Sequence, residues 1–520
     1  MIMKTRRIYV SLFIILTLTL SFINGCSSKS DSPSSAKAIT AFSLNGVAGT
    51  INETAKTITV AVPSLTNVYS LAATFTTTGS TVTVGTTTQT SGSTINNFIA
   101  PVAYTVTAAD GSAVTYTVTV TINRAWHNSA SYINPGGTDA WYPQVAMDNN
   151  GNAIIVWQQY DGTNYHIFKS EYRGGIWTNP ANLTDNISPG GAGAWNPQVA
   201  MDNNSNAIIV WQQSNGTNYH IFKSEYRSGV WTNPTGLTDN ISPNGQDATY
   251  PQVAMDNNGN AIIVWQQSDG ANFQIFKSEY RGGVWTNPAS LANKISPSGQ
   301  DAYTPYVAMD NNGNAIIVWQ QNDGVNDQIF KSEYRSGIWT NPANLSDHIS
   351  PDGTNAWNPQ VAMDNNGNAV IAWYQYDGAN NQVFKSEYRG GVWTNPANLS
   401  DHISPDGGAP SIILTPLGFS TIRVAMDNNG NTIITWFLSE LVEILSEPDS
   451  QTWESYSFVF KSEYRGGVWH NPAVSDAISG EGASYPQVAM DNNGNAIIVW
   501  MQDFYNEGLL SEMIFKSEYR

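Results

Sequence analysis

Aromatic residues recur beside a proline at regular intervals through the C-terminal three quarters of this 520-residue chain. They stand one or two residues before that proline and are Trp141, Trp195, Tyr250, Tyr303, Trp357 and Tyr485. A second recurring segment is a glutamine followed two residues later by an Asp-Gly or Asn-Gly turn, with the aspartates Asp161, Asp269, Asp323 and Asp377. Aromatic rings stack on the apolar face of a sugar, while carboxylates and amides bind its hydroxyl groups. The two sets predict a repeated glycan site, and packing of the loops that carry them is the alternative.

Residue types needed for catalysis are present but do not converge. Of the nine arginines that follow Cys26, seven occupy one repeated position, which leaves too few for a cluster that binds a carboxylate. The six histidines show no His-Glu-x-x-His spacing and have no partner cysteine, so the sequence does not favour a zinc site. It contains neither a Gly-Lys-Ser phosphate loop nor a Gly-x-Ser-x-Gly elbow. We expect no catalytic constellation, no metal and no cofactor.

Two longer markers set the period on which those residues recur. The segment Ala-Met-Asp-Asn-Asn repeats with its methionine at 147, 201, 255, 309, 363, 426 and 490, and the first four steps are 54 residues each. The segment Phe-Lys-Ser-Glu-Tyr-Arg repeats with its phenylalanine at 168, 222, 276, 330, 384, 460 and 515. A fixed period of this length is typical of a stacked array or a closed ring of identical units.

One repeat contains four short segments with strand patterning. In the first repeat, residues 143–148 lead into an Asn-Asn-Gly turn, and the β-branched run 152–159 follows it. Residues 165–173 have the alternating side-chain pattern of a strand, with Phe168, Ser170 and Tyr172 on one face. Trp177 lies in a fourth, shorter segment. No segment has a helical period, so each repeat is predicted to be a four-stranded propeller blade. The repeated tryptophans, Trp157 and Trp177 here, are expected to pack between blades.

The predicted ring is closed by the two ends of the repeat region. The last marker ends at Arg520, so the seventh repeat lacks a fourth strand, whereas Trp126-His127-Asn128 precedes the first repeat. That tripeptide matches the fourth segment of the sixth repeat, which begins at Trp469. We expect residues 124–520 to form a seven-bladed β-propeller whose last blade is completed by the N-terminal strand, because closure removes exposed sheet edges.

The Asp-Asn-Asn-Gly-Asn turn, first seen at 148–152, has a binding and a structural interpretation. Its oxygens suit calcium, but it lacks the several carboxylates and the distal glutamate of a calcium loop, so an Asx-capped hairpin is favoured. With a tryptophan nine residues after the aspartate, the segment resembles the Asp-box (BNR) hairpins of sialidase-superfamily propellers. The resemblance implies the blade architecture. It implies little else, and a divergent sialidase-like glycan hydrolase is the alternative function.

Three insertions interrupt the period in the sixth and seventh repeats. They span 407–423, 437–458 and 503–512, and we expect them on the face that carries the aromatic and Asp-Gly segments. They are richer in apolar and acidic residues than the template and include Trp453, Tyr456, Phe504 and Tyr505. Loops held by a rigid scaffold often carry function, so these four aromatics are a second candidate binding surface. Packing of the insertions on themselves is the alternative.

The first 25 residues are expected to be a signal peptide. Lys4, Arg6 and Arg7 precede an apolar stretch that is short for a membrane span. The stretch ends in Ile-Asn-Gly-Cys26, and a serine-rich segment continues to residue 36. This resembles the lipobox of bacterial lipoproteins, which implies that Cys26 carries lipid and that residues 26–36 are a membrane tether. An unmodified cysteine after a plain signal peptide is the alternative.

Residues 37–123 differ in composition from the repeats, since they are rich in threonine and valine and contain no tryptophan or cysteine. Apolar residues alternate through Ile58, Val60 and Val62, as half-buried strands require. About ninety residues of this kind suggest a small β-sandwich. It resembles the Ig-like or cadherin-like modules that lift bacterial surface domains off their anchors, and it carries no chemistry of its own.

The charge balance limits the partners. The chain has 23 Lys and Arg against 41 Asp and Glu, a net charge of −18, which argues against nucleic acid and against anionic lipid head groups. Only 12% of residues are charged, so the surface is mainly uncharged and polar. We expect an all-β, exported, lipid-anchored monomer of the bacterial cell envelope, at the outer membrane or cell surface, that binds a glycan or a protein partner.

Overall fold

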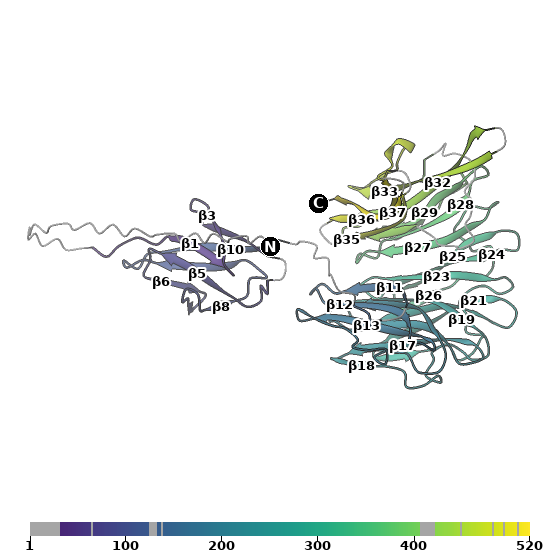
Figure 1. Cartoon of the computed structure of the whole chain (residues 1–520), viewed down its shortest axis with the longest axis horizontal. Coiled ribbons are helices and arrows are strands. Elements are labelled where there is room, and N and C mark those ends of the chain that lie inside the picture. The colour runs from purple at the N-terminus through teal and green to yellow at the C-terminus, as the bar shows by residue number, and fades with distance from the viewer. Residues whose placement is uncertain are drawn as a thin grey trace, which may run out of the picture. The chain divides into compact units, whose positions relative to one another are not determined.

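A computed structural model describes residues 32–63, 66–123, 133–136, 139–405, 422–447, 450–480, 483–491, 494–506 and 509–519 (Figure 1). The chain divides into unit 1, Met1–Ser129, and unit 2, Ala130–Arg520. The secondary structure of these residues is strand apart from one short 3-10 turn, Val474–Asp476, so the all-β prediction is confirmed. Within the described ranges, no helix has the length and apolar character needed to cross a membrane.

Unit 1 consists of two sheets around one core. The four-stranded sheet has the order β2-β1-β5-β8, with β1 Ile39–Leu44, β2 Val47–Ala48, β5 Leu71–Thr77 and β8 Ile95–Asn96. The six-stranded sheet has the order β3-β4-β10-β9-β6-β7, with β3 Thr50–Asn52, β4 Thr57–Pro63, β6 Thr81–Val84, β7 Thr87–Thr88, β9 Val102–Thr107 and β10 Ala113–Asn123. Phe42 of the first sheet packs edge-on against Tyr104 of the second at 5.3 Å. Ile58, Val60 and Val62 are fully buried, which confirms the predicted alternation.

Unit 2 is a series of antiparallel sheets, each built from strands that are consecutive in the chain. We call them blades one to seven in chain order; among the described residues blades one to six have four strands and blade seven has three. Their bounds are β11 Ala140–Met147, β12 Ala153–Tyr160, β13 Tyr165–Arg173 and β14 Ile176–Thr178; β15 Ala194–Met201, β16 Ala207–Ser214, β17 Tyr219–Arg227 and β18 Val230–Thr232; β19 Ala248–Met255, β20 Ala261–Ser268, β21 Phe273–Arg281 and β22 Val284–Thr286; β23 Ala302–Met309, β24 Ala315–Asn322, β25 Asp327–Arg335 and β26 Ile338–Thr340; β27 Ala356–Met363, β28 Ala369–Tyr376, β29 Asn381–Arg389 and β30 Val392–Thr394; β31 Arg423–Met426, β32 Thr432–Glu447, β33 Ser450–Arg465 and β34 Val468–His470; β35 Ala483–Met490, β36 Ala496–Asn506 and β37 Leu509–Tyr519. The segment 126–128, predicted to complete blade seven, lies outside the described residues.

The first strand begins earlier than the sequence predicts in blades one to five and in blade seven, at Ala140 rather than residue 143 in blade one. Pairing of β11 with β12 continues past Pro143 because the register shifts between Trp141 and Gln144. Tyr142, the residue before the proline, has a φ of 54°, so this bulge sets the proline, which has no N–H, off the hydrogen-bond ladder. The same conformation recurs at Asn196, Tyr250, Thr304, Asn358 and Tyr485.

Adjacent blades share one apolar core at each junction. Between blades two and three, Val210 and Ile221 pack with Trp265 and Phe276 in one buried cluster. Trp265 is fully buried and stacks on Phe276 with ring centroids 6.2 Å apart. Its indole N–H donates to Gln267 Oε1 (3.1 Å), which anchors the ring in the blade. The prediction that the second-strand tryptophans pack between blades is confirmed.

The Lys-Ser-Glu-Tyr-Arg marker of the third strand joins one blade to the third and fourth strands of the next. Glu225 of β17 forms ion pairs with Lys223 and Arg227 and accepts a hydrogen bond from the indole of Trp285 in blade three (2.8 Å). Lys223 lies 4.7 Å from the Trp285 ring centroid, and Arg227 lies 3.9 Å from that of Tyr280. Burial alone would raise the pKa of Glu225, but Lys223, Arg227 and Trp285 together hold that pKa below its usual value. The repeated arginines therefore serve the junctions.

The Asp-Asn-Asn-Gly-Asn turns also link neighbouring blades. In blade three, Asp256 Oδ1 accepts the backbone N–H groups of Asn258 (2.9 Å) and Asn260 (2.8 Å), and Oδ2 accepts the Asn260 amide. The backbone N–H of Asn257 donates to Asn311 Oδ1 in the next blade (3.1 Å). Both carboxylate oxygens thus have hydrogen-bond donors, which is the Asx-capped hairpin that the spacing favours over a calcium loop.

We expect the double change His166→Gln and His220→Gln to reduce the loss of stability at acidic pH. These imidazoles are buried beside serine hydroxyls, where blade three has Gln274 bonded to Ser296. Burial lowers the pKa of both histidines, so below about pH 6.5 the unfolded chain binds protons that the folded chain resists, and stability falls. Thermal melting should give equal values at pH 8 and a smaller loss for the variant at pH 5, by up to about 1 kcal/mol per site. Equal losses in both proteins would refute this role.

Candidate functional site

Two kinds of loop meet on one side of unit 2. The backbone N–H of Tyr219, at the start of β17, donates to Asp247 Oδ1 in the connection into blade three (2.8 Å). The N–H of Phe273 donates in the same way to Asp301 Oδ1 in the connection into blade four (2.7 Å). The hairpin between the second and third strands of one blade therefore touches the connection into the next, as the sequence predicted. We call this side the loop face.

The predicted aromatic set divides into two structural kinds, and all six residues lie in first strands rather than in loops. Trp141, Trp195, Tyr303 and Trp357 form one kind. The Trp195 ring lies 4.3 Å from Tyr165 of blade one, and the Tyr303 ring lies 5.3 Å from Phe273 of blade three. These pairs are half-buried between a hairpin and the next blade. One part of each ring therefore packs against a neighbouring ring, as the packing interpretation expects, and another part stays accessible to a ligand. Trp141 of blade one is 52% exposed.

Tyr250 and Tyr485 belong to the second kind, the left-handed bulge residue. Tyr250 is 55% exposed and Tyr485 48% exposed. The backbone N–H of Tyr250 donates to Gln212 Oε1 of the preceding blade (2.8 Å), and the Tyr485 ring lies 6.2 Å from Phe437. Since this position is one residue along the strand from the first kind, the six aromatics do not form one continuous platform.

The predicted aspartates cap the hairpins that carry them. Asp323 Oδ1 accepts the backbone N–H groups of Val325 (2.7 Å) and Asn326 (2.8 Å), and one oxygen of Asp161, Asp269 and Asp377 does the same in its own hairpin. Asn215 fills this role in blade two, so the turn itself does not need a charge. The second oxygen differs between blades: that of Asp161 lies 3.2 Å from the imidazole of His166, and that of Asp269 is ion-paired with Lys294.

Tyr303 has an unusual electrostatic setting on the loop face. Burial and the neighbouring carboxylates of Asp301 and Asp327 raise its pKa to about 12. Its hydroxyl thus stays protonated at neutral pH beside the carboxylate of Asp301. It can act as a hydrogen-bond donor over the whole physiological range, but the setting does not activate it as a base.

The second candidate surface is only partly described. Residues 406–421 lie outside the described residues, so most of the first insertion has no structural account. The other two were expected to be loops, but β32–β33 and β36–β37 continue through them as paired strands. Glu443 pairs with Trp453, and Tyr505 pairs with Leu510. Their β-branched and aromatic residues favour strand pairing, which explains the difference. The backbones of Trp453, Tyr456, Phe504 and Tyr505 lie in strands, and their side chains lie outside the described residues.

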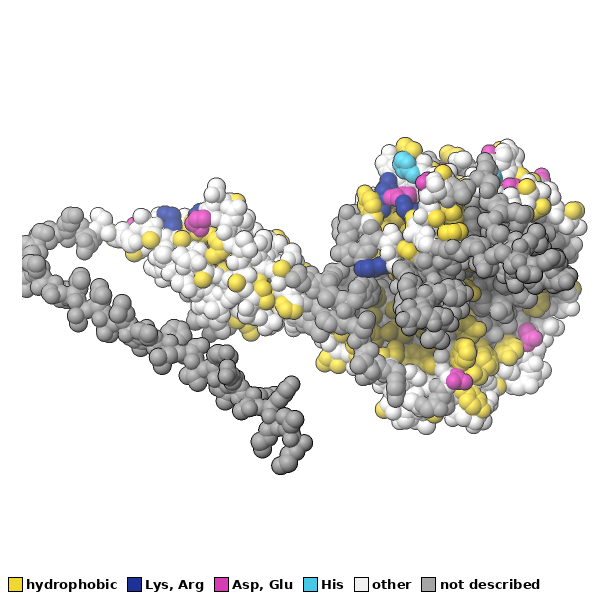
Figure 2. All heavy atoms as spheres, turned by 45° about the horizontal axis from the view of Figure 1, so that its top comes forward, with side chains coloured by type: hydrophobic (Ala, Val, Ile, Leu, Met, Phe, Trp, Pro, Cys, Tyr) yellow, Lys and Arg dark blue, Asp and Glu magenta, His cyan; other side chains and the backbone are white. Residues whose placement is uncertain are grey.

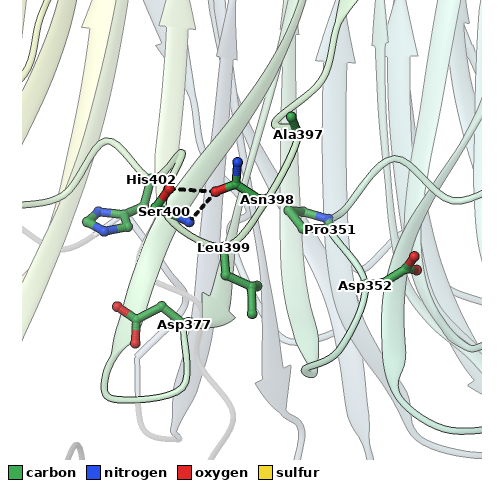
Figure 3. A pocket seen from close by; sticks show the side chains of 8 residues that line it. All are labelled: Pro351, Asp352, Asp377, Ala397, Asn398, Leu399, Ser400 and His402. Atoms are coloured by element: carbon green, nitrogen blue, oxygen red, sulfur yellow. Dashed lines mark hydrogen bonds between the residues drawn. The ribbon is translucent and has the colours of Figure 1, made fainter.

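A groove that the sequence reading did not single out opens between successive connections (Figure 3). Its volume is about 700 Å³, and its lining is Pro351, Asp352, Asp377, Ala397, Asn398, Leu399, Ser400 and His402. Figure 3 shows Leu399 pointing into the opening between Asp377 on one side and Pro351 on the other. The sequence signal was the repeated segment Asn-Leu-Ser-Asp-His-Ile-Ser-Pro at 344–351 and 398–405, which concentrates polar side chains around one leucine.

The described residues contain no group of three or more His, Cys, Asp or Glu placed to hold a metal ion. The visible face of unit 2 carries mostly uncharged side chains, with few acidic and basic ones (Figure 2). Cys26, the predicted lipid attachment residue, lies outside the described residues. The arrangement on the loop face is one of aromatic rings, amides, hydroxyls and carboxylates, a set suited to binding sugar hydroxyls.

No curated protein matches the chain. Among solved structures, an ulvan lyase bound to -[GlcA(1-4)Rha3S]- is 12% identical, with a TM-score of 0.43 over 74% of this chain and 94% of that chain. The α-L-arabinofuranosidase of Fusarium graminearum is 13% identical, with a TM-score of 0.32 over 58% and 90%. The arabinanase of Bacillus subtilis is also 13% identical, with a TM-score of 0.29 over 48% and 96%. Residues 39–120, which span both sheets of unit 1, match the family model of the SGBP N-terminal domain, the domain that begins surface glycan-binding proteins.

Proposed function

We propose that this chain is an exported glycan-binding protein of the bacterial cell envelope, held at a membrane by lipid on Cys26. The observation that carries the proposal is the match of residues 39–120 to the N-terminal domain of surface glycan-binding proteins. The half-buried aromatic pairs on the loop face support the same function, because their rings stand beside carboxylates and amides. Repetition of such a site along the blades would raise avidity without new contacts at any single blade.

In this proposal unit 2 is a seven-bladed propeller and unit 1 an Ig-like spacer. Three strands are described for blade seven where blades one to six have four, and residues 126–128 repeat the Trp-His-Asn at the fourth strand of blade six. A closed ring gives a monomer with one loop face. Nucleic acid is an unsuitable partner, since the net charge is −18.

The proposed role is binding rather than catalysis. Arg173, Arg227, Arg281, Arg335, Arg389 and Arg465 each stack on a tyrosine of the next blade. They are therefore committed to successive junctions and are not available to converge on one substrate, as a sialidase-like hydrolase would require. That hydrolase stays the alternative. Release of reducing sugar from a glycan that the chain binds would favour it.

Glycan binding is tested with an array probed by the whole mature chain, followed by titration of the best ligand. We expect Trp195→Ala and Tyr303→Ala each to weaken binding about 2- to 10-fold, because each removes one stacking ring of a repeated site. Shortening the hairpin at 437–458 to the template length should then have little effect. Val230→Ala, an exposed change on an outer strand, is the control. If the shortened hairpin abolishes binding and the aromatic changes do not, the site lies in the insertions.

A further inference from the structure

We infer that the groove in Figure 3 is a subsite for an uncharged glycan and that the same site is repeated one blade earlier. The inference rests on the glycan-binding function proposed above. The groove's volume of about 700 Å³ falls within the range of about 300–1,000 Å³ that is usual for sites of small molecules. Three segments far apart in the sequence form it: the connection into blade five, the β28–β29 hairpin and the connection into blade six.

The lining combines an apolar surface with hydrogen-bonding groups. Leu399 packs on the junction core below and, with Pro351, supplies the apolar part. Asp377 is held in place because its Oδ1 accepts two backbone N–H groups of the hairpin and its Oδ2 accepts the amide of Gln382 (3.2 Å). Ser400 donates to Asn398 Oδ1 (2.5 Å), which fixes the amide beside the opening. A pyranose presents an apolar ring face and a rim of hydroxyls, and this lining offers a partner for each.

The electrostatics of the lining favour an uncharged ligand. Burial would raise the pKa of Asp377, yet the N–H groups of Asn380 and Ala379, Gln382 and His402 together hold its pKa below the usual value, so the group is ionised at neutral pH. Asp352 adds a second carboxylate, 89% exposed. In the described hairpins and connections of blades one to six, Lys294 is the one lysine or arginine, and it is ion-paired with Asp269. A uronate or a sulfate ester brought to this surface meets like charge, whereas neutral hydroxyls meet acceptors.

Sequence repetition supplies a second copy of the site and a natural variant of it. One blade earlier the corresponding residues are Asp323, Leu345 and His348, the same types as in the groove. The His348 imidazole lies 3.3 Å from Asp352, so the two sites adjoin. Two blades earlier Lys294 replaces the histidine, and its ion pair with Asp269 joins hairpin to connection across the corresponding position. Both side chains of that pair are largely buried, at 16% and 17% exposure. The Lys294–Asp269 ion pair is therefore packed into the position that corresponds to the groove.

The test uses the whole mature chain and two sets of polysaccharides: uncharged ones (xyloglucan, galactomannan, arabinan) and uronate-rich ones (alginate, pectate). We expect binding only within the uncharged set. Asp377→Asn and Leu399→Ala should each weaken it about 5- to 10-fold, a loss typical of one lost polar or apolar contact. Asparagine already occupies the Asp377 position in blade two, so the hairpin should keep its fold. Leu291→Ala, the equivalent change at the position crossed by Lys294, is the matched control and should change little.

A gain-of-binding variant completes the experiment. Lys294→His removes the crossing ion pair and creates a third copy of the Asp, Leu and His set, so we expect it to raise avidity about 2- to 3-fold. If the chain binds uncharged glycans and none of the groove variants changes the affinity, the subsite inference is wrong while the proposed function stands. Preference for the uronate-rich set also overturns the inference. Absence of binding to any polysaccharide overturns the proposed function and the inference with it.

Discussion

Removal of residues 124–130 is expected to lower the free energy of unfolding of unit 2 by about 3–5 kcal/mol, the cost usual for losing one large packed aromatic. At five junctions a fourth-strand tryptophan lies over the marker lysine of the preceding blade. No described tryptophan covers Lys461 of blade six in this way, and its side chain is 34% exposed against 16% for Lys385, which Trp469 covers. Trp126 is the residue that the repeat assigns to this place.

The same closure should bury the inner strand of blade one. Val145 and Met147 of β11 are each 63% exposed, whereas Val199 and Met201 pack against the preceding blade. Chemical denaturation of Trp126→Ala, with Trp285→Ala as the matched control, checks the assignment. We expect comparable losses of stability from the two changes. If Trp126→Ala unfolds like the unchanged protein while Trp285→Ala is destabilised, residues 126–128 do not complete blade seven.

The change Cys26→Ser is expected to release the chain from membranes almost completely. Each buried methylene of an acyl chain contributes about 0.8 kcal/mol, and two or more chains hold a protein at a bilayer stably, whereas one is marginal. Cys26 is the single cysteine of the sequence, so no other thiol can take its place. Membrane fractionation of cells that express the variant gives the result, with Ser27→Ala as the neighbouring control. A processed Cys26→Ser protein that still sediments with membranes would show that another contact holds it.

The regular parts of both units could be predicted from the sequence because they depend on local patterns. Alternating apolar residues such as Ile58 and Val60 define strands, and Asn-Gly and Asp-Gly pairs define hairpins. The packing role of Trp265 followed from its apolar neighbours within a strand. Each of these inferences depends only on the residues of one strand or one turn, and the structure confirms the strands, the hairpins and the burial of Trp265.

What the sequence left open depends on contacts between residues far apart in the chain. Glu225 and Trp285 are 60 residues apart, and only the stacking of blades brings the carboxylate to the indole. The bulge at Tyr250 was missed because a proline normally ends pairing, whereas here a left-handed residue carries the ladder past it. The groove was missed because it is formed by the connection into blade five, the β28–β29 hairpin and the connection into blade six, which only the folded chain brings together.

The similarity of the blade junctions has a consequence for how such a gene can change. The contacts that join blades two and three recur between blades three and four, with Glu279, Lys277 and Trp339 in place of Glu225, Lys223 and Trp285. Unequal recombination between two repeats in the same reading frame would therefore delete or add 54 residues without creating a junction of a new kind. In the proposed ring, the number of blades is then limited by the curvature at which the ring can close. The insertions of blades six and seven break the 54-residue period, so an exchange that includes them changes the length of a blade.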